Sequence, residues 1–283
     1  MKKQILREML KKEQLFVPCV YDCFSAKVAE KEGYKSILLS GGALAYSLRG
    51  LPDMAFLTVD ELICATERIT NCTDLPLIVD ADDGYGESPI VVYDTVKRLI
   101  KAGAQAVTID DSTGIRGFER YVAHVAAGNK EPFLQPVVSR KIWLAKIKAA
   151  VAACHGTNCM VIARTEAFPM YDFNEMKERC ICARDLGAEM TLICSGMDTL
   201  EDAVKVNEFD KGWKMWPDIY TENGKPNVEL EDIEKLGFNL VTFHIFEKAA
   251  LYGMMLYGTK DAENSDVSFS ESHFDSNMAL SDI

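Results

Sequence analysis

The feature that most constrains the fold of this chain is a regular alternation of short apolar runs with helical patterns. Eight runs have the length and apolar content of buried strands, at 16–20, 36–40, 75–80, 106–110, 160–164, 190–194, 212–216 and 239–244. Because strand and helix alternate, we expect a parallel sheet, and eight such units predict a (β/α)8 TIM barrel rather than an open doubly wound sheet. No Gly-x-Gly-x-x-Gly motif follows the first run, which argues against a dinucleotide-binding fold.

The segments between these runs carry helix start signals. Thr58 with Glu61, and Asp198 with Glu201, have the spacing of capping boxes. Further helix starts are expected at Ser88, Ser139 and Asp172.

The pattern continues without a linker until the chain becomes polar. Residues 1–258 are therefore predicted to form a single barrel domain with an N-terminal helical segment. Residues 259–283 are rich in Ser, Asp and Asn and are predicted to be a polar C-terminal tail.

Composition limits the classes of partner. The formal net charge of −12 leaves no basic stripe for nucleic acid, so anionic substrates would have to be captured by local positive groups. No apolar run is long enough to span a membrane, and the N-terminus has no apolar signal core, so a cytoplasmic location is expected. The nine cysteines lack zinc spacing and are an odd number, which predicts free thiols rather than a disulfide framework.

Residues 77–86 combine a strand with an acidic loop. Three apolar residues run directly into Asp80, Ala81, Asp82, Asp83, Gly84, Tyr85 and Gly86. Carboxylates crowded at a strand end repel one another unless a cation lies among them, and Mg²⁺ prefers oxygen ligands. The alternative is a turn in which Asp and Gly supply caps and positive φ angles.

Barrel enzymes place their active sites at the carboxyl ends of the strands, so the residues at those ends are candidate site residues. Here they include carboxylates for a metal, one Arg for a substrate carboxylate, and glycine-rich backbone. In chain order they are Asp22, Ser40, Gly41, Gly42, Asp80, Asp82, Asp110, Asp111, Arg164, Cys194, Ser195, Lys214 and His244.

Several of these motifs occur together in one known group of enzymes. The chain resembles the isocitrate lyase/phosphoenolpyruvate mutase superfamily over nearly the whole barrel. The resemblance is carried by Tyr21-Asp22, Ser40-Gly41-Gly42, Gly50-Leu51-Pro52-Asp53, residues 80–86 and Ile162-Ala163-Arg164-Thr165-Glu166-Ala167.

The resemblance implies a Mg²⁺-dependent enzyme, with Mn²⁺ as a substitute, that acts on small anionic 2-oxo or 2-hydroxy acids. Such enzymes cleave or form C–C or C–P bonds through an enolpyruvate-like intermediate. The resemblance implies a metal site of Asp80, Asp82 and Asp110, substrate contacts from Ser40, Gly41, Gly42, Arg164, Cys194 and Ser195, and catalytic roles for Arg164, His244 and Asp53.

The loop after the fourth strand departs from the family pattern. The lyase branch carries Lys-Arg-Cys-Gly-His there, whereas this chain has no Cys between residues 73 and 153. The mutase branch has Glu-Asp-Lys, whereas this chain has Asp110-Asp111-Ser112. A different gate is therefore expected from Arg116, Arg120, Tyr121 and His124, with a plain solvated loop as the alternative.

Two further positions leave their chemistry open. Cys194 stands where relatives have His or Asn, and it is either a small apolar filler or a reactive thiol. His244 is either an acid–base group that titrates near its reference pKa of about 6.5 or a buried structural His.

Four functions are consistent with these residues. The leading hypothesis is a Mg²⁺-dependent lyase or decarboxylase of a small 2-oxo or 2-hydroxy (di)carboxylic acid, and the first alternative is phosphonopyruvate-type P–C bond chemistry. The others are a Schiff-base aldolase with Lys214 as nucleophile, and a non-catalytic barrel that binds a metabolite.

The resemblance also implies assembly. A C-terminal helix at about 246–257 is rich in Ala, Leu, Met and Tyr, and its apolar face needs a partner. Family members use this helix to contact a neighbouring subunit, so a homo-oligomer (tetramer or dimer) is expected.

Overall fold

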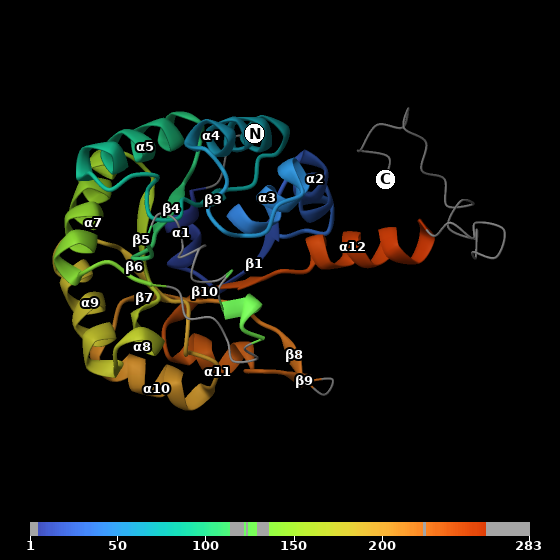
Figure 1. Cartoon of the computed structure of the whole chain (residues 1–283). Helices are drawn as coiled ribbons and strands as arrows, with labels where there is room; N and C mark the ends of the chain where they lie inside the picture. The colour runs from blue at the N-terminus through green and yellow to red at the C-terminus, as the bar shows by residue number, and fades with distance from the viewer. Residues whose placement is uncertain (1–4, 114–121, 123, 129–135, 223–224, 259–283) are drawn as a thin grey trace.

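In the computed structural model, which describes residues 5–113, 122, 124–128, 136–222 and 225–258, a closed barrel of eight parallel strands forms the centre of the molecule (Figure 1). Around the barrel the order is β1-β10-β7-β6-β5-β4-β3-β2. The barrel strands are β1 (Leu15–Val20), β2 (Ile37–Leu39), β3 (Leu77–Asp80), β4 (Ala106–Ile109), β5 (Met160–Thr165), β6 (Met190–Ile193), β7 (Trp213–Trp216) and β10 (Phe238–Phe243). A separate two-stranded sheet pairs β8 (Thr221–Glu222) with β9 (Lys225–Pro226).

Helices surround the barrel and connect its strands. They are α1 (Leu6–Leu10), α2 (Cys23–Lys31), α3 (Gly41–Arg49), α4 (Val59–Cys72), α5 (Pro89–Lys101), α7 (Arg140–Cys154), α8 (Ala167–Met170), α9 (Phe173–Asp185), α10 (Leu200–Phe209), α11 (Leu230–Lys235) and α12 (Phe246–Tyr257). The predicted (β/α)8 TIM barrel is confirmed, and each of the eight predicted strands is present with its ends within two residues of the prediction. No helix in these described segments is both long and apolar enough to cross a lipid bilayer.

The helix starts follow the predicted signals with one exception. Thr58 and Glu61 form the expected capping box at the start of α4. At the start of α10 the box is formed by Thr199 and Asp202, so the predicted pair of Asp198 and Glu201 is wrong by one residue. The physical reason is that the Thr199 hydroxyl accepts the backbone N–H of Asp202, which fixes Thr199 as the last non-helical residue.

Apolar side chains fill the inside of the barrel and its amino-terminal end. One cluster joins interior residues of the strands, such as Val17, Ile78 and Ile162, with Leu6 and Leu10 of α1. The helix α1 therefore closes the bottom of the barrel. The loops that carry the predicted site follow the carboxyl ends of the strands, at the opposite end of the barrel.

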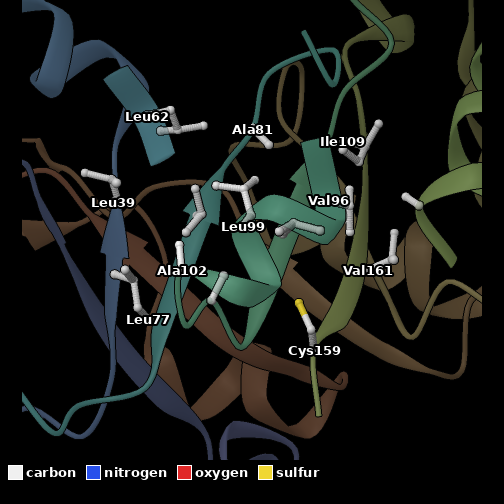
Figure 2. Packing of buried hydrophobic residues seen from close by; sticks show 14 of the residues in the cluster. Leu39, Leu62, Leu77, Ala81, Val96, Leu99, Ala102, Ile109, Cys159 and Val161 are labelled. Carbon is white, nitrogen blue, oxygen red and sulfur yellow. The ribbon is translucent and has the colours of Figure 1, made fainter. Parts of the chain in front are cut away.

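A second apolar layer lies between the strands and the surrounding helices. Figure 2 shows part of it, where Leu39, Leu77 and Val161 of the strands face Val96 and Leu99 of α5. These side chains are fully or almost fully buried, so burial of apolar surface packs α5 against the strands of the barrel.

The last helix, α12, behaves differently from the others. It extends away from the ring of helices, in orange-red in Figure 1. Its apolar side chains are exposed, with Tyr252 at 68% and Met255 at 69%. The predicted tail, 259–283, lies outside the described residues.

All nine cysteines are free in the structure, as predicted.

Candidate active site

Successive side chains of a strand point to opposite faces, so one set of polar side chains points into the mouth of the barrel. Ile78, Ile162 and Leu192 belong to the barrel interior. The residues two positions further along the same strands therefore face the same way, and these are Asp80, Arg164 and Cys194. The contacts agree: Arg164 Nη1 lies 3.2 Å from Asp80 Oδ2, and Cys194 packs against the interior cluster.

An acidic pair lies beside the start of α3. A Cβ placed on Gly41 would lie 3.8 Å from Asp82 Oδ2 and 3.9 Å from Asp80 Oδ2, so both carboxylates converge on the space next to this glycine. Asp82 adopts a φ of 45°, a strained conformation for a non-glycine residue, and this turn presents its side chain to the site. The Asp80 side chain also accepts a hydrogen bond of 2.6 Å from Thr108 Oγ1.

Asp110 is fully buried at the end of β4. Its Oδ1 accepts hydrogen bonds from Ser112 N at 3.0 Å and Ser112 Oγ at 2.7 Å. Burial raises the pKa of Asp110 to about 7, although the positive charge of Arg164 and the Ser112 hydrogen bond oppose the rise. A cation next to this carboxyl would favour its ionised form.

Arg164 is held by a second carboxylate. Its Nε and Nη2 donate to Glu166 Oε1 at 3.0 and 2.7 Å, while Ser195 Oγ donates to Glu166 Oε2. Although burial opposes ionisation of Glu166, the charge of Arg164 and the Ser195 hydrogen bond lower its pKa. The guanidinium is thus fixed between Asp80 and Glu166.

A buried ion pair supports this arrangement from the outer layer. Arg179 of α9 is 1% exposed and donates from Nη1 to Asp111 Oδ2 at 2.9 Å. Asp111 in turn accepts from the backbone N–H of Glu166 at 2.8 Å and from the hydroxyl of Thr165. Sequence reasoning assigned no role to Glu166 or Arg179, although the motif at 162–167 contains Glu166 next to Arg164.

A second buried ion pair holds the acidic loop. Lys146 of α7 donates from Nζ to Asp83 Oδ2 at 2.8 Å and to the Asp83 carbonyl at 3.0 Å. Both side chains are at most 8% exposed. Asp83 is therefore a structural member of the loop, and its partner was not predicted because Lys146 lies 63 residues away in the sequence.

Ser40, Gly41 and Gly42 form the start of α3. The Ser40 hydroxyl accepts the backbone N–H of Ala43 at 3.2 Å and caps the helix. The first N–H groups of a helix lack helical acceptors and favour anions, so this end can bind a carboxylate. The side chain of Asp53 packs against Gly42, where a Cβ would come within 3.0 Å of it.

Burial and charged neighbours determine the ionisation of Cys194. Burial raises the pKa of its thiol, and the Glu166 carboxylate beside it adds to the rise, although Arg164 opposes it. The thiol therefore stays protonated at neutral pH, which favours the interpretation of Cys194 as a small apolar lining group.

Lys214 does not reach the barrel mouth. Met215 belongs to the interior, so its neighbour Lys214 faces the outer layer. The ammonium donates to the carbonyls of Asp210 at 2.8 Å and Gly212 at 3.1 Å, which precede β7 at the amino-terminal end. Its expected place at the carboxyl end was wrong, and the aldolase alternative loses its nucleophile.

The structure describes some of the remaining predicted residues but not all of them. Asp22 is the N-cap of α2 and forms a capping box with Ser25. Arg116, Arg120 and Tyr121 lie outside the described residues, and His124 is half-buried in a short described segment. His244 directly follows β10 at the barrel mouth.

Comparison with known proteins identifies the family. The family model described as phosphoenolpyruvate phosphomutase matches residues 6–261. The chain belongs to this family. It thus falls in the isocitrate lyase/phosphoenolpyruvate mutase superfamily, as the motifs at 80–86 and 162–167 predicted.

Relatives of the family with known names include lyases and decarboxylases. The chain is 35% identical over 188 residues to 2-methylisocitrate lyase of Salmonella typhimurium, a match that covers 66% of this chain and 60% of the relative. It is 32% identical over 207 residues to oxaloacetate decarboxylase of Paraburkholderia xenovorans, covering 71% and 65%. The matches thus span less than two thirds of the length of these relatives.

Solved structures of the superfamily share the fold. Oxaloacetate acetylhydrolase in complex with its product oxalate superimposes with a TM-score of 0.77 at 26% identity, covering 95% of this chain and 93% of that one.

The carboxylates at the barrel mouth are suitable ligands for a magnesium ion. Among the residues that the structure describes, no group of three or more His, Cys, Asp or Glu side chains forms a metal-binding cluster made of protein alone. Mg²⁺ commonly binds through one or two carboxylates and keeps several waters. The convergence of Asp80 and Asp82 beside Gly41 supplies such a pair.

Proposed function

We propose that this protein is a Mg²⁺-dependent lyase or decarboxylase that cleaves a small 2-oxo or 2-hydroxy (di)carboxylic acid through an enolpyruvate-like intermediate. The observation that carries the proposal is the placement of Arg164 against Asp80 inside the barrel mouth, 3.2 Å apart. A permanent cation next to an acidic pair at the barrel mouth can hold a carboxylate and a divalent ion together. The named relatives include a 2-methylisocitrate lyase and an oxaloacetate decarboxylase, which supports C–C cleavage.

In this proposal, different side chains bind the substrate and the metal ion. Arg164 binds the substrate carboxylate, and the N–H groups of Gly41 and Gly42 at the start of α3 bind a second substrate oxygen with the hydroxyl of Ser40. Asp80 and Asp82 hold Mg²⁺, with Asp110 in the surrounding carboxylate shell. When bound, the ion withdraws electrons from the 2-oxo group as the bond breaks.

Other residues support Arg164 and the start of α3. Glu166 and Ser195 fix the direction of the Arg164 guanidinium, and Cys194 lines the space beside it. Asp53 lies next to Gly42 at the mouth and is a candidate for moving a substrate proton.

The name of the matching family model favours one second candidate, P–C bond chemistry on a phosphonopyruvate-like substrate. A phosphonate dianion needs more cationic partners than a carboxylate. Arg116 and Arg120 are the candidates in this chain.

Turnover assays on a small substrate panel test the proposal. Oxaloacetate, 2-methylisocitrate, 2,3-dimethylmalate and phosphonopyruvate are offered with Mg²⁺, and CO₂, keto acid and phosphate are measured. We expect C–C cleavage of at least one acid, complete loss in EDTA, recovery with Mg²⁺ or Mn²⁺, and a loss of at least about 100-fold in Asp80→Asn.

The control is Asp198→Asn, which removes the same charge from an exposed residue in the loop after β6. Turnover that survives EDTA or Asp80→Asn contradicts the metal mechanism. Phosphate release alone supports the second candidate, and binding of the panel without turnover indicates a non-catalytic relative.

We also propose that the chain forms a homo-oligomer through α12. The helix carries Leu251, Tyr252, Met254, Met255 and Leu256, each exposed by 46–69%. A continuous apolar helix face of this kind is stable in water only when another surface covers it.

A further inference from the structure

Asp218 contacts both the backbone and the ring of His244. The backbone N–H of His244 donates to Asp218 Oδ1 at 3.2 Å. The same carboxylate oxygen lies 3.4 Å from His244 Nδ1. One carboxylate therefore fixes the position of His244 and faces its imidazole.

Asp218 is itself held by the seam between β7 and β10. The indole of Trp216, which is fully buried, donates to the Asp218 carbonyl at 3.1 Å. The next residue, Ile219, donates its N–H to the carbonyl of Thr242 at 2.9 Å. Two strands thus determine where the carboxylate lies.

The other neighbour of the imidazole comes from β1. Cys19 is fully buried, belongs to the barrel interior, and lies next to the His244 side chain. Because β10 pairs with β1 on one side and β7 on the other, the ring lies between a thiol and a carboxylate. Both are groups to which a protonated imidazole can donate.

We propose that Asp218 is a positioning residue that keeps His244 protonated, so that its imidazolium serves as a fixed cation at the barrel mouth and binds an anionic group of the substrate.

The groups around the imidazole act in the same direction. Burial alone would lower the pKa of His244, but the carboxylate of Asp218, with Cys19 next to the ring, raises it to about 11. Glu247 in the first turn of α12 adds negative charge next to Cys19. At neutral pH the ring is therefore a hydrogen-bond donor, whereas the sequence left open an acid–base group that titrates near neutrality or a buried structural His.

This assignment deepens the proposed function. Arg164 stands on β5 and His244 follows β10, three strands apart around the barrel. Two cations at separate points of one mouth match a substrate with two anionic groups. The substrate contact rests on the proposed function, whereas the protonation of His244 does not.

The protonation state is measured directly by NMR of the imidazole nitrogens in the full chain without substrate. The four histidines give few signals, and His244→Gln identifies the one of interest. We expect the His244 signals of the wild type to stay in the protonated form up to about pH 9, because Asp218 stabilises the imidazolium. In Asp218→Asn, which keeps the acceptor for the backbone N–H, the midpoint should fall by at least about 2 pH units.

Asp198→Asn is the matched control and should leave the His244 titration unchanged. Oxalate then probes anion binding by calorimetry at about pH 7.5, where we expect about 10-fold weaker binding in Asp218→Asn than in the control. A wild-type His244 that titrates near its reference value of about 6.5, or a titration unaltered by Asp218→Asn, overturns the inference.

Equal oxalate affinity in Asp218→Asn and the control overturns the anion-binding role. Absence of turnover on every panel substrate counts against the proposed function. The titration of His244 tests the role of Asp218 independently of that result. If Asp218→Asn does not fold, the wild-type titration still decides the question, because a midpoint near the reference value of about 6.5 overturns the inference.

Discussion

His244 shows how the ionisation of one residue depends on neighbours that are distant in the sequence. Asp218 lies 26 residues before it, and Cys19 comes from the first strand. The side chain was recognisable as a candidate from its place after the eighth barrel strand. Its charge was not, because an isolated His titrates near neutrality and only the neighbouring carboxylate changes that.

The pH dependence of stability follows from this shift. The pKa of His244 is raised from 6.5 to about 11 in the folded chain. The folded state therefore binds this proton more tightly, and the stabilisation is complete below about pH 6.5 and is lost as pH rises toward 11. Urea denaturation at several pH values between 6.5 and 11 should show that the free energy of unfolding falls more steeply with pH in the wild type than in Asp218→Asn. Equal slopes in the two proteins would contradict the shift, and Asp198→Asn should decline like the wild type.

At the scale of elements, local signals placed most helices and all eight barrel strands. The capping box of Thr58 and Glu61 was predicted correctly, whereas the start of α10 was misplaced by one residue. The short helices α3 and α8 were missed because each follows a strand end that the sequence presents as loop. The apolar layers hold these elements together, and ion pairs between distant segments add to this, such as Lys146 of α7 with Asp83 of the loop after β3.

The Lys146–Asp83 pair gives a stability prediction. Lys146→Met leaves the buried Asp83 carboxylate without its partner, which should lower the free energy of unfolding by about 3–5 kcal/mol. Urea denaturation measures the change. Adding Asp83→Asn should restore part of the loss, because the uncompensated charge is then gone.

The exposed pair of Lys205 and Glu201 on α10 provides the control. Lys205→Met should leave the unfolding free energy unchanged within error, since both side chains are solvated. A loss in Lys146→Met no larger than in Lys205→Met would show that the buried pair does not hold the acidic loop.

At the scale of the whole molecule, closure of the barrel brings the site together. Asp80, Arg164 and the start of α3 come from β3, β5 and the segment after β2, and only the closed cylinder directs them into one mouth. The same closure keeps Lys214 out of the barrel mouth, because its side chain faces the outer layer at the opposite end of the barrel. In contrast, α12 extends beyond the closed structure with its apolar side chains uncovered.

Assembly is tested on α12. Leu251→Glu with Met255→Glu places two charges on its exposed apolar face, at positions i and i+4. If α12 contacts another copy, light scattering after gel filtration should show a smaller mass than for the wild type. Lys248→Glu, an exposed change on the same helix, should keep the wild-type mass. A monomeric wild type, or a mass unchanged by the double variant, contradicts assembly through α12.

The sequence by itself determined the order of strands and helices, the barrel class, the family and the candidate residues at 80–86 and 162–167, because periodicity, caps and contiguous motifs are local. The tertiary structure decided which of those residues share a space. It placed Glu166 and Arg179 behind Arg164, turned Lys214 away, and set Asp218 and Cys19 around His244. The reason is that direction, burial and charge partnership arise between segments far apart in the chain, which no local pattern records.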